Sequence, residues 1–287
     1  MTGEQRRPPP KSLNVAAVTM SCHQDPEANL RKITDTVGSI MGERPDTQLV
    51  VFGEMILGWY DPEDMPEYHR RISLQTSHDS LGPVSKMASD FGIYISMGFS
   101  EMHEGIIHNS QLLFDRLGNL RAVHRKHNLK PAEIRCGYHP GVEGFTMTRI
   151  MGLKTVLAIC SDLASLETIR RLSWKRPDLI ILSLADDSDP GFLMARCNAR
   201  IYDSWIVTAN RFGLEDDRVW EGHTVISSPW GRLEEASTGR ETVLFHQLGF
   251  PSRKNLPLRL LRKLIVRAPL PFIVLANRKR LHEYFQR

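Results

Sequence analysis

Short aliphatic runs recur along this chain of 287 residues and constrain its fold more than any other feature. The runs consist mainly of β-branched and other aliphatic residues, and each is short and bounded by Gly, Pro, Asp or Asn, as strands are. They are Leu13–Val18, Leu49–Phe52, Ile93–Phe99, Ser110–Asp115, Thr155–Ile159, Leu179–Leu184, Trp205–Ala209, Thr224–Ser227 and Val243–Phe245. Segments of helical period, notably Pro26–Met41 and Leu166–Trp174, separate some of the runs. The alternation predicts an α/β fold.

One pair of runs predicts a hairpin, so the sheets are expected to be mixed. Asn109–Gly118 is followed by Leu120–His124, and Arg116–Asn119 has the composition of a turn. The simplest organisation is one domain over residues 12–248, between a disordered tail at 1–11 and a C-terminal extension.

Four widely separated cysteines set the expected compartment. Their spacing matches neither a disulfide framework nor a zinc site, which favours a reducing cytoplasm. The N-terminal MTGEQRRPPPK has no apolar stretch after its arginine pair, so no secretion signal is predicted.

Cys160 is the first candidate for chemistry, because dinucleotide-binding, P-loop, HExxH and GxSxG motifs are absent. It follows the predicted strand Thr155–Ile159 and precedes a predicted helix with Ser165 as N-cap. Its thiol would therefore lie at the sheet edge, beside backbone N–H groups able to form an oxyanion hole. A small buried hydrophobic residue is the other interpretation of such a cysteine.

Two charged residues follow other predicted strands: Glu54 after LVVFG and Lys126 after LRAVHR. A desolvated glutamate has a raised pKa and could remove a thiol proton. A neighbouring lysine would favour the thiolate of Cys160, and hence its rapid alkylation near neutral pH, and would stabilise an oxyanion. Taken singly, each residue is more often a solvated surface charge. Only the combination indicates a catalytic site.

The segments around these residues, FGEMILGWY, HRKHNL and VLAICSDL, resemble the signature motifs of the nitrilase superfamily of carbon-nitrogen hydrolases in their usual order. HPG, ANRFG and WEGHTVISSPWG match further family segments, and the resemblance covers about residues 12–248. It implies a four-layer α-β-β-α sandwich with mixed sheets. It also implies a homo-oligomer, usually a dimer of eight layers.

The resemblance gives Glu54 the role of base, Lys126 that of oxyanion stabiliser and Cys160 that of nucleophile. Glu133 matches a second family glutamate that orients the lysine and substrate; capping a surface turn is the other interpretation. Ser161 replaces a frequent tyrosine, but its backbone N–H can still serve an oxyanion hole.

The implied reaction is hydrolysis of an amide, N-carbamoyl or nitrile carbon-nitrogen bond through a thioester, with amides and carbamoyl compounds favoured. No metal or organic cofactor is expected. Transfer of the acyl group to an amine would use the same thioester. A catalytically silent scaffold is the competing function, because Ser161 and Ala164 depart from the family pattern. A papain-like hydrolase would need a histidine base, and no histidine lies in a recognisable partner motif.

Residues beyond the core set bear on specificity. Asp186, Asp187 and Asp189 follow a predicted strand and could attract a cationic substrate, or form a solvated acidic loop. Tyr60 and Trp205 could line the pocket or belong to the core.

The extension over residues 249–287 is strongly basic. Residues 251–287 hold ten Lys or Arg and one Glu, a net charge of +9, against −5 for the preceding chain. Basic and apolar residues of 256–267 fall on different faces of a predicted helix. Two interpretations of this extension remain open: a helix that lies on anionic lipid, and a family-type arm that packs on a partner subunit. Nucleic-acid binding is disfavoured, because aromatic residues do not interleave with the charges.

Overall fold

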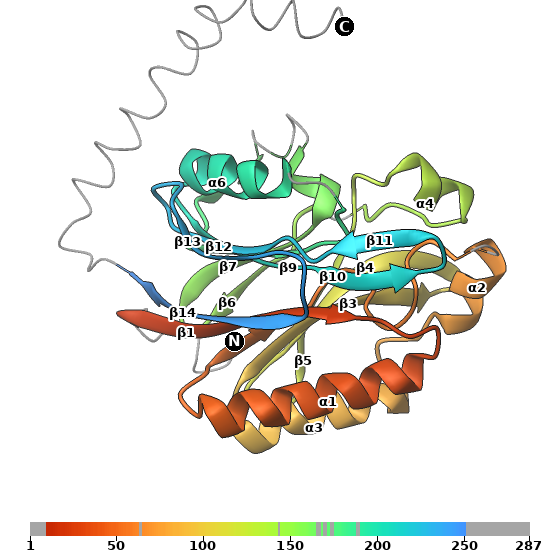
Figure 1. Cartoon of the computed structure of the whole chain (residues 1–287), viewed down its shortest axis with the longest axis horizontal. Helices are drawn as coiled ribbons and strands as arrows, with labels where there is room; N and C mark the ends of the chain where they lie inside the picture. Colours follow the sequence, from red (N-terminus) through yellow and green to blue (C-terminus); the bar gives the residue numbers. More distant parts are fainter. Residues whose placement is uncertain are drawn as a thin grey trace, which may run out of the picture. The chain divides into compact units, whose positions relative to one another are not determined.

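Two β-sheets face each other in the computed structural model, and helices cover the outer face of each (Figure 1). The structure describes residues 10–62, 65–142, 144–164, 168, 171–172, 175–187 and 190–250. The predicted α/β class and the four-layer α-β-β-α sandwich with mixed sheets are confirmed.

The first sheet has the strand order β11-β10-β1-β2-β3-β4-β5, and β14 also pairs with β1. Its strands are β1 (Ser12–Ser21), β2 (Leu49–Val51), β3 (Tyr94–His103), β4 (Ile106–Phe114), β5 (Leu120–Arg125), β10 (Arg211–Glu215), β11 (Arg218–Glu221) and β14 (Thr242–Gly249). Strands β1, β2 and β3 are parallel, whereas β3, β4 and β5 are antiparallel. The antiparallel pair β4–β5 is the hairpin that the sequence predicted.

The second sheet has the order β13-β12-β9-β8-β7-β6. Its strands are β6 (Met147–Ile150), β7 (Leu153–Ile159), β8 (Leu179–Ser183), β9 (Trp205–Ala209), β12 (Thr224–Ser227) and β13 (Leu233–Ser237). Strands β7, β8 and β9 are parallel and in register, so their carboxyl ends meet at one edge of the sheet. Side chains at this edge can converge on one site.

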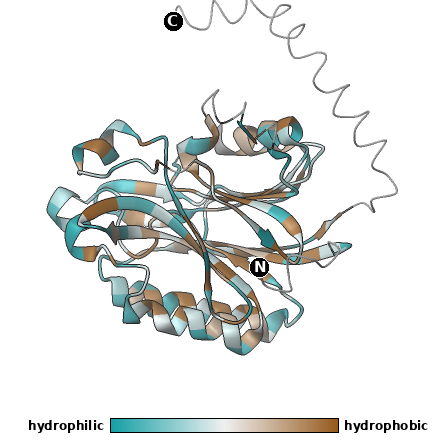
Figure 2. Ribbon diagram, turned by 180° about the vertical axis from the view of Figure 1, so that it is seen from behind, coloured by the Kyte–Doolittle hydropathy of each residue, from teal (hydrophilic) through white to brown (hydrophobic). Residues whose placement is uncertain are grey.

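Helices form the two outer layers. The helical elements are α1 (Pro26–Glu43), α2 (Met65–Ile72), η2 (Asp79–Leu81), α3 (Gly82–Phe91), α4 (Pro131–Arg135), η3 (Cys160–Ala164) and α6 (Pro190–Tyr202). Helices α1 and α3 lie on the first sheet and α6 on the second (Figure 1). Hydrophilic and hydrophobic residues alternate along α1 and α3 (Figure 2), as expected for helices with one buried face. Among the helices described, none is long and apolar enough to cross a membrane.

Helix α1 illustrates how the sequence sets an element. The Asp25 carboxylate accepts hydrogen bonds from the backbone N–H groups of Glu27 and Ala28, which caps the helix. The apolar residues at helical spacing are buried: Leu30, Ile33, Val37 and Ile40. The predicted helix therefore forms and extends two residues further, to Glu43.

Several predicted segments lie wholly or partly outside the described residues. They are the tail at 1–11 except Pro10 and Lys11, most of the helix Leu166–Trp174, and the basic extension beyond residue 250. The two interpretations of the extension stay predictions.

The two sheets approach closely where β2 and β8 end. The backbone N–H of Glu54 donates to the carbonyl of Leu184 at 3.1 Å. A Cβ atom on Gly98 of β3 would lie 2.7 Å from the Cα of Glu54, so this close approach requires glycine. The packing of the sheets thus fixes the backbone of Glu54.

Candidate active site

A buried cluster of charges lies where strands β2 and β5 end. The ammonium of Lys126 contacts Glu54 Oε1 at 2.8 Å and Glu133 Oε2 at 2.9 Å. The amide of Asn109 donates to Glu54 Oε1 at 2.7 Å and to Glu133 Oε1 at 2.6 Å. Ala185 N donates to the second oxygen of Glu54 at 2.8 Å. The lysine and both carboxylates are therefore held in fixed positions.

Each member of the cluster is placed by its own element. Glu54 follows β2, and Lys126 follows β5, where its N–H donates to the carbonyl of Asn109 at 2.9 Å. Glu133 lies in the first turn of α4, where its carboxylate also accepts from the N–H of Lys130 at 2.7 Å. The Glu133 side chain thus caps α4 and also contacts Lys126, while its contact with the substrate stays a prediction.

Burial determines the charge states in the cluster. Burial disfavours the ammonium of Lys126, but Glu54 and the other neighbouring groups together outweigh this effect, and the pKa of the lysine is raised well above its ordinary value. Burial also raises the pKa of Glu54, although Lys126 opposes the shift. A raised carboxyl pKa suits a group that must accept and return a proton near neutral pH.

Cys160 begins η3, directly after β7, and its side chain is buried. Its φ angle of 39° lies in the left-handed region, as does that of Met55 beside Glu54. Non-glycine residues rarely adopt this conformation, which is enriched at active sites.

The Cys160 thiol is neutral near pH 7. Its pKa is raised to about 12, chiefly by burial and next by the charge of Glu54, whereas Lys126 opposes the shift. Lys126 therefore favours the thiolate, as expected, but burial outweighs this effect, so we expect slow rather than rapid alkylation of the free protein near neutral pH. The positive charge of Lys126 is already balanced by two carboxylates, and a single sequence does not show that pairing.

Asp162 was not identified from the sequence, although it lies two residues after Cys160 in VLAICSDL. Its fully buried carboxylate accepts from His124 Nε2 at 2.8 Å and from the N–H groups of His127, Asn128 and Ile159 at 2.9, 3.0 and 3.0 Å. It thereby joins the turn after the lysine to the turn that carries the cysteine. Asp162 is a positioning residue.

Asp162→Asn is expected to lower the free energy of unfolding by about 2 kcal/mol, because its hydrogen bonds lose their charge assistance. Burial alone would raise the pKa of Asp162, but hydrogen bonds, chiefly from His124, lower it. A depressed pKa stabilises the fold above the unfolded pKa, and this contribution is lost as pH falls through the folded value. Urea unfolding at about pH 7 and about pH 3 should show the two proteins converging in acid. An equal loss in the exposed control Asp35→Asn would contradict the assignment.

Arg211 and Glu215 were also missed, because charged residues in a short run resemble a solvated loop. The buried guanidinium of Arg211 donates to the carbonyl of Glu54 at 3.0 Å and to that of Met55 at 2.8 Å, and it pairs with Glu215. Glu215 in turn accepts from the N–H of Tyr60 at 2.7 Å. This pair fixes the loop that follows Glu54.

The predicted specificity residues lie in different settings. Tyr60 is buried, and its hydroxyl is close enough to affect the pKa of Lys126. The hydroxyl of Ser161 donates to the carbonyl of Asn128 at 2.5 Å, which leaves its backbone N–H as the group relevant to an oxyanion hole. Trp205 begins β9 opposite the start of β8, at the far end of the sheet from Cys160, and is buried, so of its two interpretations the structure favours the core.

The predicted acidic loop is partly neutralised by Arg218. This arginine contacts Asp187 at 3.0 Å and Asp61 at 2.7 Å. Asp186 is buried, and its backbone exchanges hydrogen bonds with the side chain of Asn210 at 3.1 and 2.8 Å. Asp189 lies outside the described residues. The loop is therefore not solvated as a whole, because Asp186 is buried. The carboxylate of Asp187 is not free either, because Arg218 contacts it.

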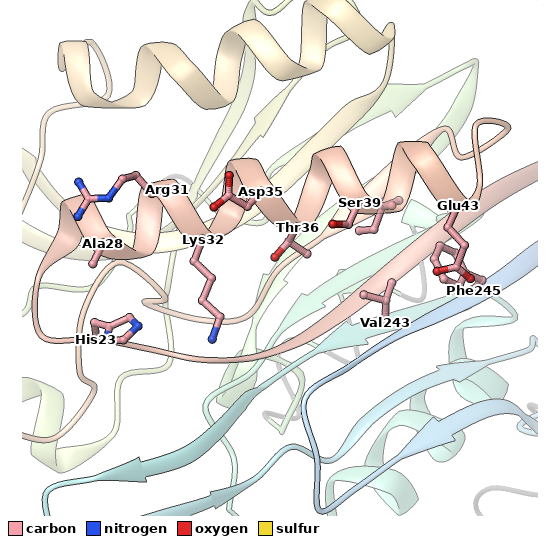
Figure 3. A pocket seen from close by; sticks show the side chains of 11 residues that line it. His23, Ala28, Arg31, Lys32, Asp35, Thr36, Ser39, Glu43, Val243 and Phe245 are labelled. Carbon is pink, nitrogen blue, oxygen red and sulfur yellow. The ribbon is translucent and has the colours of Figure 1, made fainter.

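A cavity of about 500 Å³ lies elsewhere, between α1 and β14 (Figure 3). Its lining combines charged residues of α1, such as Arg31 and Asp35, with Val243 and Phe245. None of the predicted site residues lines it.

Comparison with known proteins gives consistent matches. Residues 14–255 match a model of the carbon-nitrogen hydrolase family. A probable nitrilase, C965.09, of Schizosaccharomyces pombe is 28% identical over 258 residues, covering 84% of this chain and 92% of that protein. An (R)-stereoselective amidase of Pseudomonas sp is 28% identical over 216 residues, covering 73% and 74%. The crystal structure of Saccharomyces cerevisiae Nit3, a member of branch 10 of the nitrilase superfamily, has a TM-score of 0.75 at 22% identity, covering 86% and 95%.

Proposed function

The chain belongs to the carbon-nitrogen hydrolase family, and we propose that it cleaves amide or N-carbamoyl bonds through a thioester on Cys160. The observation that carries the proposal is the buried contact of Lys126 with both Glu54 and Glu133. The turn after Lys126 is hydrogen-bonded through Asp162 to the turn that carries Cys160. The amidase among its relatives supports amide-like substrates over nitriles.

In the first half-reaction, Glu54 accepts the thiol proton as the sulfur of Cys160 attacks the carbonyl carbon. The negative charge that develops on the carbonyl oxygen is stabilised by the ammonium of Lys126 and the backbone N–H of Ser161. Glu54 returns the proton to the nitrogen, the carbon-nitrogen bond breaks, and ammonia or an amine leaves. The acyl group remains on sulfur.

In the second half-reaction, Glu54 accepts a proton from water as the water oxygen attacks the thioester. The carbon-sulfur bond then breaks, the acid leaves, and the proton returns to the thiol of Cys160. An amine acting in place of water would give acyl transfer. We also propose that the protein forms a homo-oligomer and is located in the cytoplasm. Neither property affects the reaction steps.

Trapping the intermediate tests this function. Wild-type protein, Cys160→Ala and the control Cys22→Ala are mixed with a panel of simple amides and quenched in acid. We expect ammonia release and a mass gain equal to the acyl group in wild type and Cys22→Ala only. Hydroxylamine should intercept the thioester as a hydroxamate, and added amines should report transfer. Folded protein that releases no ammonia and carries no adduct with any amide would favour the silent scaffold.

A further inference from the structure

Arg218 connects two loops that both reach Glu54. Its Nη1 donates to Asp61 at 2.7 Å, and its Nη2 and Nε donate to Asp187 at 3.0 and 3.3 Å. Asp61 belongs to the loop that follows Glu54, and Asp187 belongs to the loop that follows β8. Because the guanidinium group is planar and rigid, this one side chain sets the separation of two carboxylates from different loops.

The loop after β8 contacts both the backbone and the carboxylate of Glu54. The carbonyl of Leu184 accepts from the N–H of Glu54 at 3.1 Å, and the N–H of Ala185 donates to Glu54 Oε2 at 2.8 Å. Asp187 lies two residues after Ala185, where the loop is exposed to solvent. Its ion pair with Arg218 therefore holds the exposed end of the segment that orients Glu54.

The loop after Glu54 is held by the same hairpin that carries Arg218. In the hairpin β10–β11, Arg218 lies directly opposite Glu215. The buried carboxylate of Glu215 accepts from the N–H of Tyr60 at 2.7 Å, one residue before Asp61. Adjacent residues of this loop are thus attached to the hairpin, one through Glu215 and the other through Arg218.

Aromatic rings hold the guanidinium group of Arg218 in place. Its central carbon lies 4.3 Å from the centre of the Trp220 ring and 5.8 Å from that of the Tyr60 ring. Both rings are buried. An arginine that stacks on rigid rings loses less conformational freedom when it forms ion pairs. These ion pairs therefore differ from isolated surface pairs, which contribute little to stability.

We propose that Arg218 is a positioning residue: by bridging Asp61 and Asp187 it holds the two loops in place and so fixes the carboxylate of Glu54. The inference rests on the proposed function, in which Glu54 exchanges a proton with Cys160. Misplacing a reacting group by about 1 Å can reduce a rate by about 10²-fold. Loss of the bridge is therefore expected to lower kcat more than it changes KM.

Steady-state kinetics on the amide that wild type hydrolyses fastest test the proposal. Arg218→Gln should lower kcat by about tenfold or more, while KM changes by less than about threefold. Arg218→Lys keeps the charge but lacks the planar fork that contacts both carboxylates, so its kcat should be intermediate. The matched control Arg31→Gln removes an exposed arginine that pairs with Asp25 and should leave both constants unchanged.

A mutant cycle distinguishes the bridge from an independent effect of the arginine. Asp61→Asn combined with Asp187→Asn should lower kcat by a factor similar to that of Arg218→Gln. Adding Arg218→Gln to this pair should cost little more, because residues that act as a unit give non-additive losses. Losses that multiply would mean that Arg218 acts without the aspartates, and the inference would be overturned.

Hydrogen–deuterium exchange reports on the two loops without requiring turnover. Peptides covering residues 55–61 and 184–187 should exchange faster in Arg218→Gln than in wild type, whereas peptides of α1 should be unchanged. Circular dichroism and thermal melting establish that each variant is folded. Unchanged exchange in both loops, or a kcat of Arg218→Gln equal to that of wild type, would contradict the positioning role. Faster exchange in both loops, in a protein whose wild type releases no ammonia from any amide, would defeat the proposed function and leave the placement of Glu54 by Arg218 standing.

Discussion

Glu54→Gln is expected to lower kcat/KM for amide hydrolysis by about 10³-fold, the range lost when a general acid–base group is removed, while making Cys160 alkylate faster than in wild type. The loss of activity follows because Glu54 is the carboxylate that takes the thiol proton and returns it to the leaving nitrogen in the proposed mechanism. Hydrolysis and alkylation are therefore predicted to change in opposite directions.

The faster alkylation of Cys160 in Glu54→Gln has an electrostatic cause. Burial is the main reason that the pKa of Cys160 is raised to about 12, and the charge of Glu54 is the next. Replacing Glu54 by Gln removes that negative charge and leaves Lys126 less fully compensated, so the thiol pKa falls. A lower pKa gives a larger thiolate fraction near neutral pH, and the thiolate is the reactive form.

Iodoacetamide labelling followed by intact mass and peptide mapping measures this effect. Wild-type Cys160 should label slowly at about pH 7 and faster as pH rises, because its thiolate fraction grows tenfold per pH unit below the pKa. Glu54→Gln should label faster at every pH below that value. The control Glu104→Gln, an exposed carboxylate, should match wild type. If alkylation and hydrolysis both slowed in Glu54→Gln, the electrostatic account of the neutral thiol would be contradicted.

The sequence predicted the strands that carry the site better than the interactions at their ends. Thr155–Ile159 and Trp205–Ala209 are apolar enough to be recognised alone, and strand ends place Glu54 and Cys160 at a sheet edge. The sequence motifs then grouped residues that are distant in the chain. Burial, however, is a property of the packed sheets, so the neutral state of Cys160 could not be predicted from a motif.

The residues that sequence reasoning missed share one feature: their partners are remote in the chain. Arg211 donates to carbonyls more than 150 residues earlier, and Asp162 binds a histidine 38 residues before it. Taken alone, a charged residue in a short β-strand is expected to face solvent.

Lys126→Met is expected to lower the free energy of unfolding by about 3–5 kcal/mol, the cost of leaving buried charges without their partner. Glu54 and Glu133 would then face each other across the position of the ammonium, with the Asn109 amide as their remaining shared donor. Their repulsion, added to burial, would raise the carboxyl pKa values further. Exposed Lys154→Met serves as the control and should change stability little.

The pH dependence of that loss distinguishes buried charge from lost packing. When a carboxyl pKa is higher in the folded state, the folded protein takes up a proton that the unfolded protein binds only at lower pH, so stability falls as pH rises through this window. The deficit of Lys126→Met should therefore be larger at about pH 8 than at about pH 5.5 in urea unfolding. Adding Glu54→Gln should recover part of the stability, because one of the two uncompensated charges is removed. It should not recover activity, since the base and the oxyanion stabiliser are then both absent. A deficit that is independent of pH and unchanged in the double variant would mean that Lys126 stabilises the fold by packing, and that its ammonium is not the counter-ion of the two carboxylates.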